Sequence, residues 1–283
     1  MTDRIEIFEV GPRDGLQNEA RHIPTADKIA LVDRLSQAGF RRIEVASFVS
    51  PKWVPQMADS ADVLAGIRRA SGVSYAALTP NMRGFEGAVA AKADEIAIFG
   101  SASEGFSKAN INATIAESLQ RFEPVVAAAK RAGLPVRGYV SCVTDCPYDG
   151  KTAPEQAARV AKALFEMGCY EVSLGDTIGQ ATPESISSML SAVLSEIPAG
   201  QVAGHYHDTS GRALDNIEAS IDLGVRVFDA AVGGLGGCPY APGAAGNVAT
   251  EHVIERVHSL GFETGLDQAI VLDAAAIAQK MRS

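Results

Sequence analysis

The chain has 283 residues, of which 47% are hydrophobic and 21% are charged, and its formal net charge is -9. This acidic balance argues against nucleic acid or an anionic membrane as the main partner. No apolar run is long enough to span a bilayer, and residues 1–4 lead into a strand-like segment without a targeting pattern. We therefore expect a cytoplasmic protein with a large apolar core.

Short apolar runs alternate along the chain with longer amphipathic stretches. This alternation predicts strands and helices in turn, which is the pattern of a parallel sheet. The predicted strands, eight in number, are residues 5–10, 42–46, 73–78, 95–99, 136–142, 171–174, 201–207 and 226–231.

The amphipathic stretches predict a helix after each strand. Glycines such as Gly39 and Gly133 directly follow these stretches, where a left-handed helix end is expected, and Thr182-Pro183 is typical of a helix start. A further helix is predicted at residues 266–282, outside the repeats. The eight helices between and after the strands are residues 25–38, 58–70, 82–91, 112–132, 154–167, 183–196, 212–223 and 247–260.

Eight strand–helix repeats predict closure into a (β/α)8 TIM barrel. We expect one catalytic domain over residues 1–283, an α/β barrel with an extra C-terminal helix. A doubly wound open sheet is the alternative, but no GxGxxG motif follows the first strand.

Polar residues after the strands are the first candidates for a site, because TIM-barrel active sites lie at the carboxyl ends of the strands. Arg13 and Asp14 come directly after the first strand. An isolated Arg–Asp pair is more often a loop salt bridge, but this position favours function. Glu44 lies inside the second strand and is expected to point into the barrel, where a buried carboxylate needs a partner such as Arg13 or a metal-bound group. A core ion pair is the alternative interpretation for Glu44.

His205 and His207 stand two residues apart at the end of the seventh predicted strand. Side chains alternate along a strand, so the two imidazoles share one face and Tyr206 takes the other. Two imidazoles near an aspartate are a candidate metal site. Asp208 is more easily explained as a cap of the next helix.

Asn247 begins the last predicted helix of the repeats, so it is either a helix cap or a further ligand. Together with one aspartate and two histidines, its amide oxygen would complete a nitrogen and oxygen donor set without thiolate. Such a set suits Mg²⁺ or Mn²⁺ with coordination positions left for substrate. Asp176, after the sixth strand, would either orient a ligand or stabilise a turn.

Cys238 lies in the glycine-rich segment 233–247, GGLGGCPYAPGAAGN. Glycines permit unusual backbone angles and close approach to a ligand, so the segment is a candidate lid that carries a thiol to the site. A surface loop with an incidental cysteine is the alternative. Cys142, Cys146 and Cys169 form no CxxC pair and are expected in or near packed strands and turns of a protein from a reducing compartment.

The chain resembles the 3-hydroxy-3-methylglutaryl-CoA lyase family of bacterial type nearly end to end. The resemblance is carried by EVGPRDGLQNE (9–19), SFVSPKWVPQMAD (47–59), LGDTIG (174–179), HYHDT (205–209) and GGLGGCPYAPGAAGN (233–247). The last motif is highly specific. The family is a metal-dependent barrel that cleaves 3-hydroxy-3-methylglutaryl-CoA to acetyl-CoA and acetoacetate, a reaction of leucine degradation and ketone-body formation. Tyr206 departs from the family pattern, where some members carry cysteine.

Carried over by position, the resemblance implies that Asp14, His205, His207 and Asn247 bind Mg²⁺ or Mn²⁺. It implies that Arg13 is the catalytic arginine, Cys238 the lid cysteine and Glu44 a supporting carboxylate. Asp14 and His205 are both candidates for the general base of a retro-Claisen cleavage. The implied partner is a small acyl-CoA substrate. The sequence leaves open whether the chain forms a homo-oligomer.

Several other functions fit parts of this pattern. A lyase for a longer 3-hydroxy-3-acylglutaryl-CoA, an acyl-CoA condensing enzyme of the same barrel and a pyruvate-type aldolase differ mainly in substrate or direction. The condensing enzymes usually carry a further C-terminal region, for which 283 residues leave no room. A non-catalytic binding barrel is disfavoured because Arg13, the histidine pair and Cys238 occur together.

Overall fold

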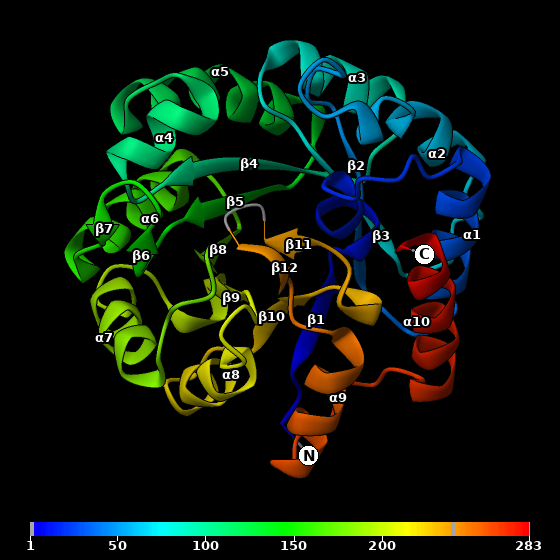
Figure 1. Ribbon diagram of the computed structural model, residues 1–283. Coiled ribbons are helices and arrows are strands. Elements are labelled where there is room, and N and C mark those ends of the chain that lie inside the picture. The colour runs from blue at the N-terminus through cyan, green and yellow to red at the C-terminus, as the bar shows by residue number, and fades with distance from the viewer. Residues whose placement is uncertain (1–2, 239–240, 283) are drawn as a thin grey trace.

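The computed structural model describes residues 3–238 and 241–282, with side chains described for all of these except 237–238 and 241–245. Eight parallel strands close into a barrel in the order β1-β10-β9-β8-β5-β4-β3-β2 (Figure 1). The predicted (β/α)8 barrel is therefore confirmed, and the open sheet is excluded. The barrel strands are β1 (Glu6–Glu9), β2 (Arg42–Ser47), β3 (Ser74–Leu78), β4 (Glu95–Ser101), β5 (Val136–Ser141), β8 (Glu171–Asp176), β9 (Val202–Tyr206) and β10 (Val227–Ala230).

Helices cover the outside of the barrel between successive strands (Figure 1). One of them, α4 (Glu104–Ile111), was not predicted, because no helix was assigned between the strand at 95–99 and the helix predicted at 112–132. Asn112 has a φ of 49°, so its left-handed backbone separates α4 from α5. The other helices after the strands are α1 (Thr25–Leu35), α2 (Ser60–Gly66), α3 (Met82–Ala90), α5 (Ile115–Ala132), α6 (Pro154–Met167), α7 (Pro183–Leu194), α8 (Ala213–Asp222) and α9 (Thr250–Ser259).

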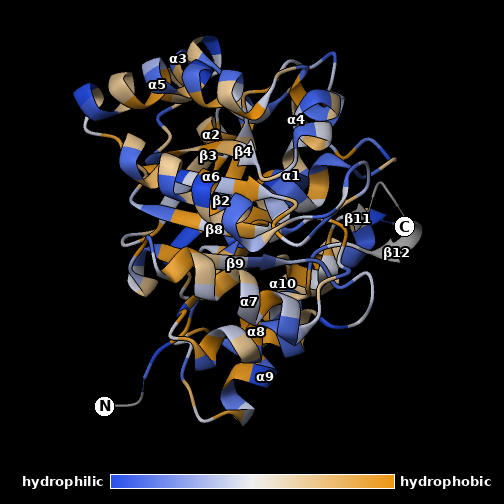
Figure 2. Ribbon diagram, turned by 90° about the vertical axis from the view of Figure 1, so that its left-hand side faces the viewer, coloured by the Kyte–Doolittle hydropathy of each residue, from blue (hydrophilic) through white to orange (hydrophobic). Residues whose placement is uncertain are grey.

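The extra C-terminal helix, α10 (Gln268–Arg282), packs beside α1, as predicted (Figure 1). Helix ends also follow the sequence signals. Gly133 after α5 has a φ of 70°, and Thr182 caps α7 through a hydrogen bond from the backbone N–H of Ser185. Helices such as α5 carry both hydrophobic and hydrophilic residues in Figure 2, as expected of helices that cover a barrel with one face.

No helix within the described residues is long and apolar enough to cross a lipid bilayer.

Charged residues from the amino ends of the strands pair with one another inside the barrel. Arg42 Nε donates to Glu6 Oε1 at 2.6 Å, and Arg42 Nη1 donates to Glu171 Oε1 at 2.9 Å. Arg137 Nε donates to the same Glu171 oxygen at 2.7 Å. We call these four residues, Glu6, Arg42, Arg137 and Glu171, the floor network.

Short elements follow the carboxyl ends of several strands and form the opposite rim of the barrel, whereas η3 directly precedes β9. The glycine-rich segment contains an antiparallel hairpin of β11 (Gly237–Cys238) and β12 (Ala241–Ala245). The predicted last helix of the repeats begins at Thr250 and not at residue 247, because β12 and a bridge at Asn247 precede it. The remaining elements are η1 (Gly11–Gly15), η2 (Pro55–Met57), β6 (Asp145–Cys146), β7 (Gly150–Lys151), η3 (Ala199–Gln201) and η4 (Val232–Gly234).

Candidate active site

A single tight turn brings Arg13 and Asp14 to the carboxyl end of β1. The backbone N–H groups of Arg13, Asp14 and Gly15 all point at the carbonyl oxygen of Val10, at 3.2, 2.8 and 3.2 Å. The resulting five-residue π-helix, η1, begins with Gly11-Pro12. Such one-turn π elements are frequent at functional sites, and this one directs two consecutive charged side chains toward the barrel mouth.

Arg13 is buried and holds two carboxylates. Its Nε donates to Glu44 Oε2 at 2.7 Å, and its Nη1 donates to Asp14 Oδ1 at 2.6 Å. Burial lowers the pKa of Arg13, but Glu44 and Asp14 outweigh it and raise this pKa above its usual range, so the guanidinium is charged. Glu44 is fully buried, as its predicted inward direction requires, and its predicted pairing with Arg13 is observed.

Asp14, His205 and His207 converge at this rim. One potential ligand atom from each lies within 4.8 Å of the others. His205 Nε2 is 3.9 Å from Asp14 Oδ2, and the two imidazole rings have centroids 5.3 Å apart. Tyr206 points away, as predicted, because its hydroxyl pairs with Ser220 Oγ of α8 at 2.9 Å.

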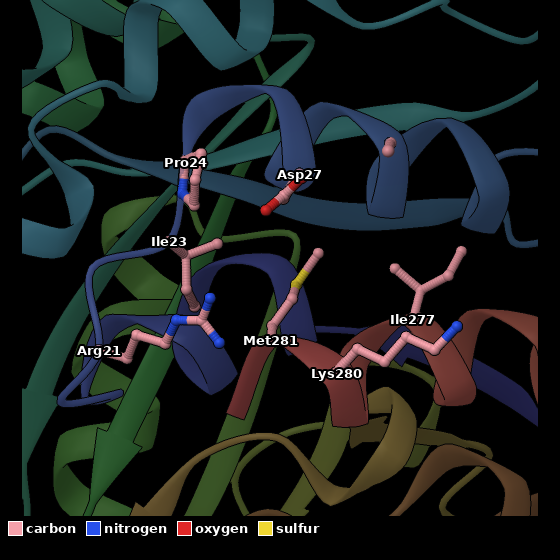
Figure 3. Close-up of a pocket in the computed structure, with 8 residues that line it drawn as sticks. Arg21, Ile23, Pro24, Asp27, Ile277, Lys280 and Met281 are labelled. Carbon is pink, nitrogen blue, oxygen red and sulfur yellow. The ribbon is translucent and has the colours of Figure 1, made fainter. Parts of the chain in front are cut away.

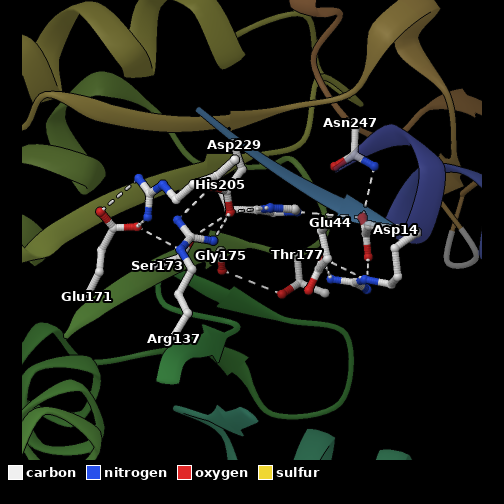
Figure 4. Close-up of polar contacts among 12 residues, drawn as sticks. Asp14, Glu44, Arg137, Glu171, Ser173, Gly175, Thr177, His205, Asp229 and Asn247 are labelled. Atoms are coloured by element: carbon white, nitrogen blue, oxygen red, sulfur yellow. Dashed lines mark hydrogen bonds and ion pairs between the residues drawn. The ribbon is translucent and has the colours of Figure 1, made fainter. Parts of the chain in front are cut away.

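Asn247 joins the same group and does not cap α9. Its Nδ2 donates to Asp14 Oδ2 at 2.9 Å (Figure 4), and its backbone forms an antiparallel bridge with His207. Of the two alternatives for Asn247, the helix cap is therefore excluded, since Ala249 precedes the first residue of the helix.

The donor set fits a divalent cation. His207 Nδ1 is buried without a hydrogen-bond partner among the described residues. Burial, with a smaller contribution from the neighbouring His205, lowers the pKa of His207 to about 4, whereas burial of Asp14 is outweighed by Arg13 and the histidines, which lower its pKa to about 2. A neutral imidazole and an ionised carboxylate are the forms that bind cations. Two imidazoles and a carboxylate, without thiolate, form a donor set for a divalent cation.

Comparison with known proteins agrees with this arrangement. A family model described as HMGL-like matches residues 4–277. The chain belongs to the HMGL-like family. The resemblance inferred from the motifs is thereby confirmed.

Curated relatives and solved structures of the HMGL-like family match almost all of the chain. A Danio rerio protein named 3-hydroxy-3-methylglutaryl-CoA lyase, cytoplasmic, is 60% identical over 95% of this chain and 81% of its own length. A Pseudomonas aeruginosa protein named 3-hydroxy-3-isohexenylglutaryl-CoA/hydroxy-methylglutaryl-CoA lyase is 57% identical over 96% of this chain and 90% of its own.

Among solved structures, the HMG-CoA lyase from Brucella melitensis is 62% identical, with a TM-score of 0.98 and 99% coverage of both chains. An HMG-CoA lyase from Acinetobacter baumannii, solved in complex with coenzyme A and 3-methylmalate, is 37% identical with a TM-score of 0.93, covering 99% of this chain and 92% of its own. The fold of this chain is therefore closely similar to the folds of two proteins named as HMG-CoA lyases.

Two other polar residues singled out from the sequence, Asp208 and Asp176, accept hydrogen bonds from nearby backbone N–H groups. Asp208 Oδ1 accepts from the backbone N–H of Ala213, the first residue of α8, as expected for a cap. Asp176 accepts from the backbone N–H groups of Gln180 and Ala181, so it stabilises the turn after β8. Burial raises the pKa of Asp176 to about 6.

The cysteines divide into two groups. Cys142, Cys146 and Cys169 are free and buried, in agreement with the prediction that they are packed residues. The backbone of Cys238 lies in β11, but its side chain is outside the described part of the structure, so its delivery to the site stays a prediction.

Sequence reasoning missed four residues beside the site. Tyr139 lies under Arg13, with the guanidinium 5.6 Å from its ring centroid, and its buried hydroxyl has no partner among the described residues. Asp229 contacts His205 and is held by Arg137 and Ser173. A lone charged residue inside an apolar strand, the signal used for Glu44, would also have found Arg137 and Asp229.

A cavity of about 190 Å³ lies elsewhere, between the start of α1 and the end of α10 (Figure 3). Its lining includes Arg21, Asp27 and Lys280 and none of the residues that converge at the barrel rim. The candidate site of this HMGL-like chain is therefore defined by its converging polar side chains and is separate from this cavity.

Proposed function

We propose that this chain is a carbon–carbon lyase that cleaves 3-hydroxy-3-methylglutaryl-CoA to acetyl-CoA and acetoacetate with Mg²⁺ or Mn²⁺. The observation that carries the proposal is the convergence of Asp14, His205 and His207 within 4.8 Å of one another, beside the buried Arg13. It occurs at the rim where TIM barrels carry their active sites. The same reaction places the protein in leucine degradation and ketone-body formation.

The cation would be held by Asp14, His205, His207 and the amide oxygen of Asn247. When bound, a divalent cation polarises the substrate hydroxyl and carboxylate and lowers the pKa of the hydroxyl. For Asn247 to contribute its oxygen, the amide now donating to Asp14 would present its other end, since amide nitrogen and oxygen are nearly equal in shape.

Arg13 would stabilise the negative charge that develops on the thioester oxygen as the carbon–carbon bond breaks. A charged donor fixed before the reaction is most effective in a site that excludes water. Glu44 and Asp14 fix the guanidinium through its Nε and Nη1 atoms, so Glu44 acts as a supporting carboxylate.

Proton transfer would involve three residues. Asp14 or His205 would take the proton of the substrate hydroxyl. Both are candidates because Asp14 Oδ2 and His205 Nε2 lie only 3.9 Å apart, so a hydroxyl bound beside one atom is also close to the other. Cys238 would take part in protonating the acetyl carbon, with the glycine-rich hairpin limiting the access of water.

Similarity of this chain to the Pseudomonas relative supports a second substrate. That protein is named for 3-hydroxy-3-isohexenylglutaryl-CoA as well as hydroxymethylglutaryl-CoA, at 57% identity. A lyase with a longer acyl chain in its substrate would use the same Asp14, His205 and His207, so the alternative concerns only the acyl pocket.

The proposal also covers the domain organisation, location and partners of the protein. Residues 1–283 would form one catalytic domain, supported by the meeting of Asp14, in η1 after β1, with Asn247 from the last repeat. The Danio rerio relative is named cytoplasmic, which supports the same location here. The substrate would be a small acyl-CoA, with no nucleic acid partner, and the chain would act as a homo-oligomer.

A coupled assay for acetoacetate tests the proposed function. Purified protein would be given 3-hydroxy-3-methylglutaryl-CoA with Mg²⁺, and with EDTA in a parallel sample. We expect turnover only with the cation. Cation-dependent turnover of the isohexenyl substrate alone would favour the longer-chain lyase. No turnover of either substrate would contradict the proposal.

A further inference from the structure

The two histidines of the rim differ in what their second ring nitrogen contacts. His205 Nδ1 lies 3.1 Å from Asp229 Oδ2. His207 Nδ1 is buried and has no hydrogen-bond partner among the described residues. The protein therefore orients the His205 imidazole through a carboxylate, whereas Nδ1 of His207 has no hydrogen-bond partner among the described residues.

Asp229 is itself surrounded by hydrogen-bond donors. Arg137 forms two parallel hydrogen bonds to it, from Nη1 to Oδ2 at 3.0 Å and from Nη2 to Oδ1 at 2.7 Å. Ser173 Oγ donates to Oδ2 at 2.7 Å. Figure 4 shows these side chains gathered around Asp229, which is almost fully buried in β10. A carboxylate that faces a charged guanidinium on both oxygens can only accept.

The contact with Asp229 therefore decides which nitrogen of His205 carries the proton. Because the carboxylate accepts, His205 Nδ1 must donate, and the neutral ring then carries its lone pair on Nε2. Nε2 is the atom that faces Asp14, 3.9 Å from Asp14 Oδ2.

We propose that Asp229, held by Arg137 and Ser173, is a positioning residue that fixes His205 in the Nδ1–H tautomer and presents Nε2 to the cation site. The inference rests on the proposed function, which supplies the cation. The inference also links the floor network to this site, because Arg137 donates hydrogen bonds to both Glu171 and Asp229. A carboxylate behind a metal-binding histidine fixes ring orientation and raises ligand basicity.

The tautomer can be measured without any cation or substrate. Long-range ¹H–¹⁵N spectra of protein labelled at its five histidines distinguish the two tautomers, and a His205→Gln sample assigns the His205 signals. We expect the Nδ1–H form for His205 in the wild type at pH 8. An Nε2–H ring, or an even mixture, would overturn the proposal, and this result requires no variant of Asp229 to fold.

Asp229→Asn tests the consequence for cation binding. Asparagine keeps the size but removes the charge and one acceptor, so the preference of His205 for one tautomer weakens. We expect Mn²⁺ affinity, measured by the loss of the free-ion EPR signal, to fall about 10–100-fold. The matched control is Glu95→Gln, a buried barrel carboxylate that accepts from Ser74 and Tyr170 and does not touch His205.

The outcomes separate this inference from the proposed function. Equal Mn²⁺ affinities in Asp229→Asn and Glu95→Gln, with both proteins folded by circular dichroism, would overturn the positioning role. A wild type that binds no Mn²⁺ would refute the proposed cation site, while the spectra would still decide the tautomer of His205. Loss of affinity confined to Asp229→Asn, together with a mixed tautomer, would support the proposal.

Discussion

The two ends of the barrel differ in how completely their buried polar atoms are paired. At the amino end, none of the floor-network residues has a buried side-chain atom without a partner, within the part of the chain that the structure describes. Toward the carboxyl end, Glu44 Oε1, Tyr139 OH and His207 Nδ1 are buried and unpaired among the same residues.

This difference has a physical meaning. Burying an unpaired polar group costs roughly 1–3 kcal/mol, so a fold retains such groups mainly where something else binds them. The floor network completes its hydrogen bonds within the chain and holds the strands together. The rim leaves donors and acceptors for a ligand, which is the pattern expected of a binding site.

Removing a residue proposed to bind the cation should have the largest effect on turnover. We expect His207→Ala to abolish turnover at the cation concentration that saturates the wild type, because a methyl group cannot replace an imidazole ligand. Mn²⁺ titration followed by EPR would measure the affinity. His252→Ala, on the exposed face of α9, is the matched control. Unchanged Mn²⁺ affinity in His207→Ala would remove His207 from the cation site.

Cys238, in the glycine-rich hairpin, is the residue proposed to protonate the acetyl carbon. We expect Cys238→Ala to lower kcat by about 10²–10⁴-fold, the range for loss of a general acid or base, while Mn²⁺ affinity stays at the wild-type value. Cys169→Ala, at a buried cysteine outside the motifs, is the control. Full activity in both Cys238→Ala and Cys238→Ser would contradict the role in proton transfer.

Arg13 links the site to its supporting carboxylates. We expect Arg13→Lys to be almost as damaging as Arg13→Met, since lysine keeps the charge but loses the planar group that reaches Glu44 and Asp14 together. The fall should appear in kcat, by about 10²–10³-fold, with KM changed less. If Arg13→Lys instead melts much earlier and keeps its kcat, Arg13 is a structural ion-pair residue.

The sequence was sufficient for features that depend on local pattern. The alternation of short apolar runs with amphipathic stretches predicted the barrel strands, and strand alternation predicted that His205 and His207 share a face. The short helix α4 was missed because its eight residues give little hydrophobic periodicity, and the left-handed Asn112 that ends it leaves no mark on that periodicity.

The rest depends on contacts between distant segments. Asp229 reaches His205 because β10 pairs with β9, and it reaches Arg137 across the barrel, 92 residues away in the chain. Asn247 meets Asp14 across 233 residues. Closure of the barrel sets these distances, and no local pattern in the sequence specifies them.

Removing Arg42 from the floor network should affect stability and leave the chemistry intact. We expect Arg42→Met to lower the free energy of unfolding by roughly 1–3 kcal/mol, because Glu6 and Glu171 lose a partly buried partner. The kcat of the folded variant should stay near the wild-type value, since Arg42 contacts no rim residue. Urea unfolding beside steady-state kinetics measures both quantities. A large fall in kcat with unchanged stability would show that the two ends are not separate in this way.

Glu9 offers the smallest and most specific test, because it is a rim carboxylate whose hydrogen bonds are complete. Its Oε1 accepts from the backbone N–H groups of Gly11 and Val232, at 2.8 and 2.9 Å, and Thr250 Oγ1 donates to Oε2 at 2.7 Å. One side chain thus ties the loop before Arg13 to η4 and the start of α9. Burial raises the pKa of Glu9 to about 7, against the lowering effect of these hydrogen bonds and with help from the nearby charge of Glu251.

The direction of the pH dependence follows from this shift. Since the folded pKa lies above the unfolded one, the folded state holds the proton more tightly, and stability falls as pH rises from about 4.5 through about 7. Glu9→Gln keeps one acceptor for the two N–H groups and a donor for Thr250, so it should remove this dependence. We expect the variant to match the wild type near pH 5 and to exceed it by roughly 1–3 kcal/mol at pH 8, measured by urea unfolding. Parallel profiles of unfolding free energy against pH for the two proteins would mean that the pKa of Glu9 is not raised in the folded state. Ionisation of Glu9 would then not lower the stability of the protein.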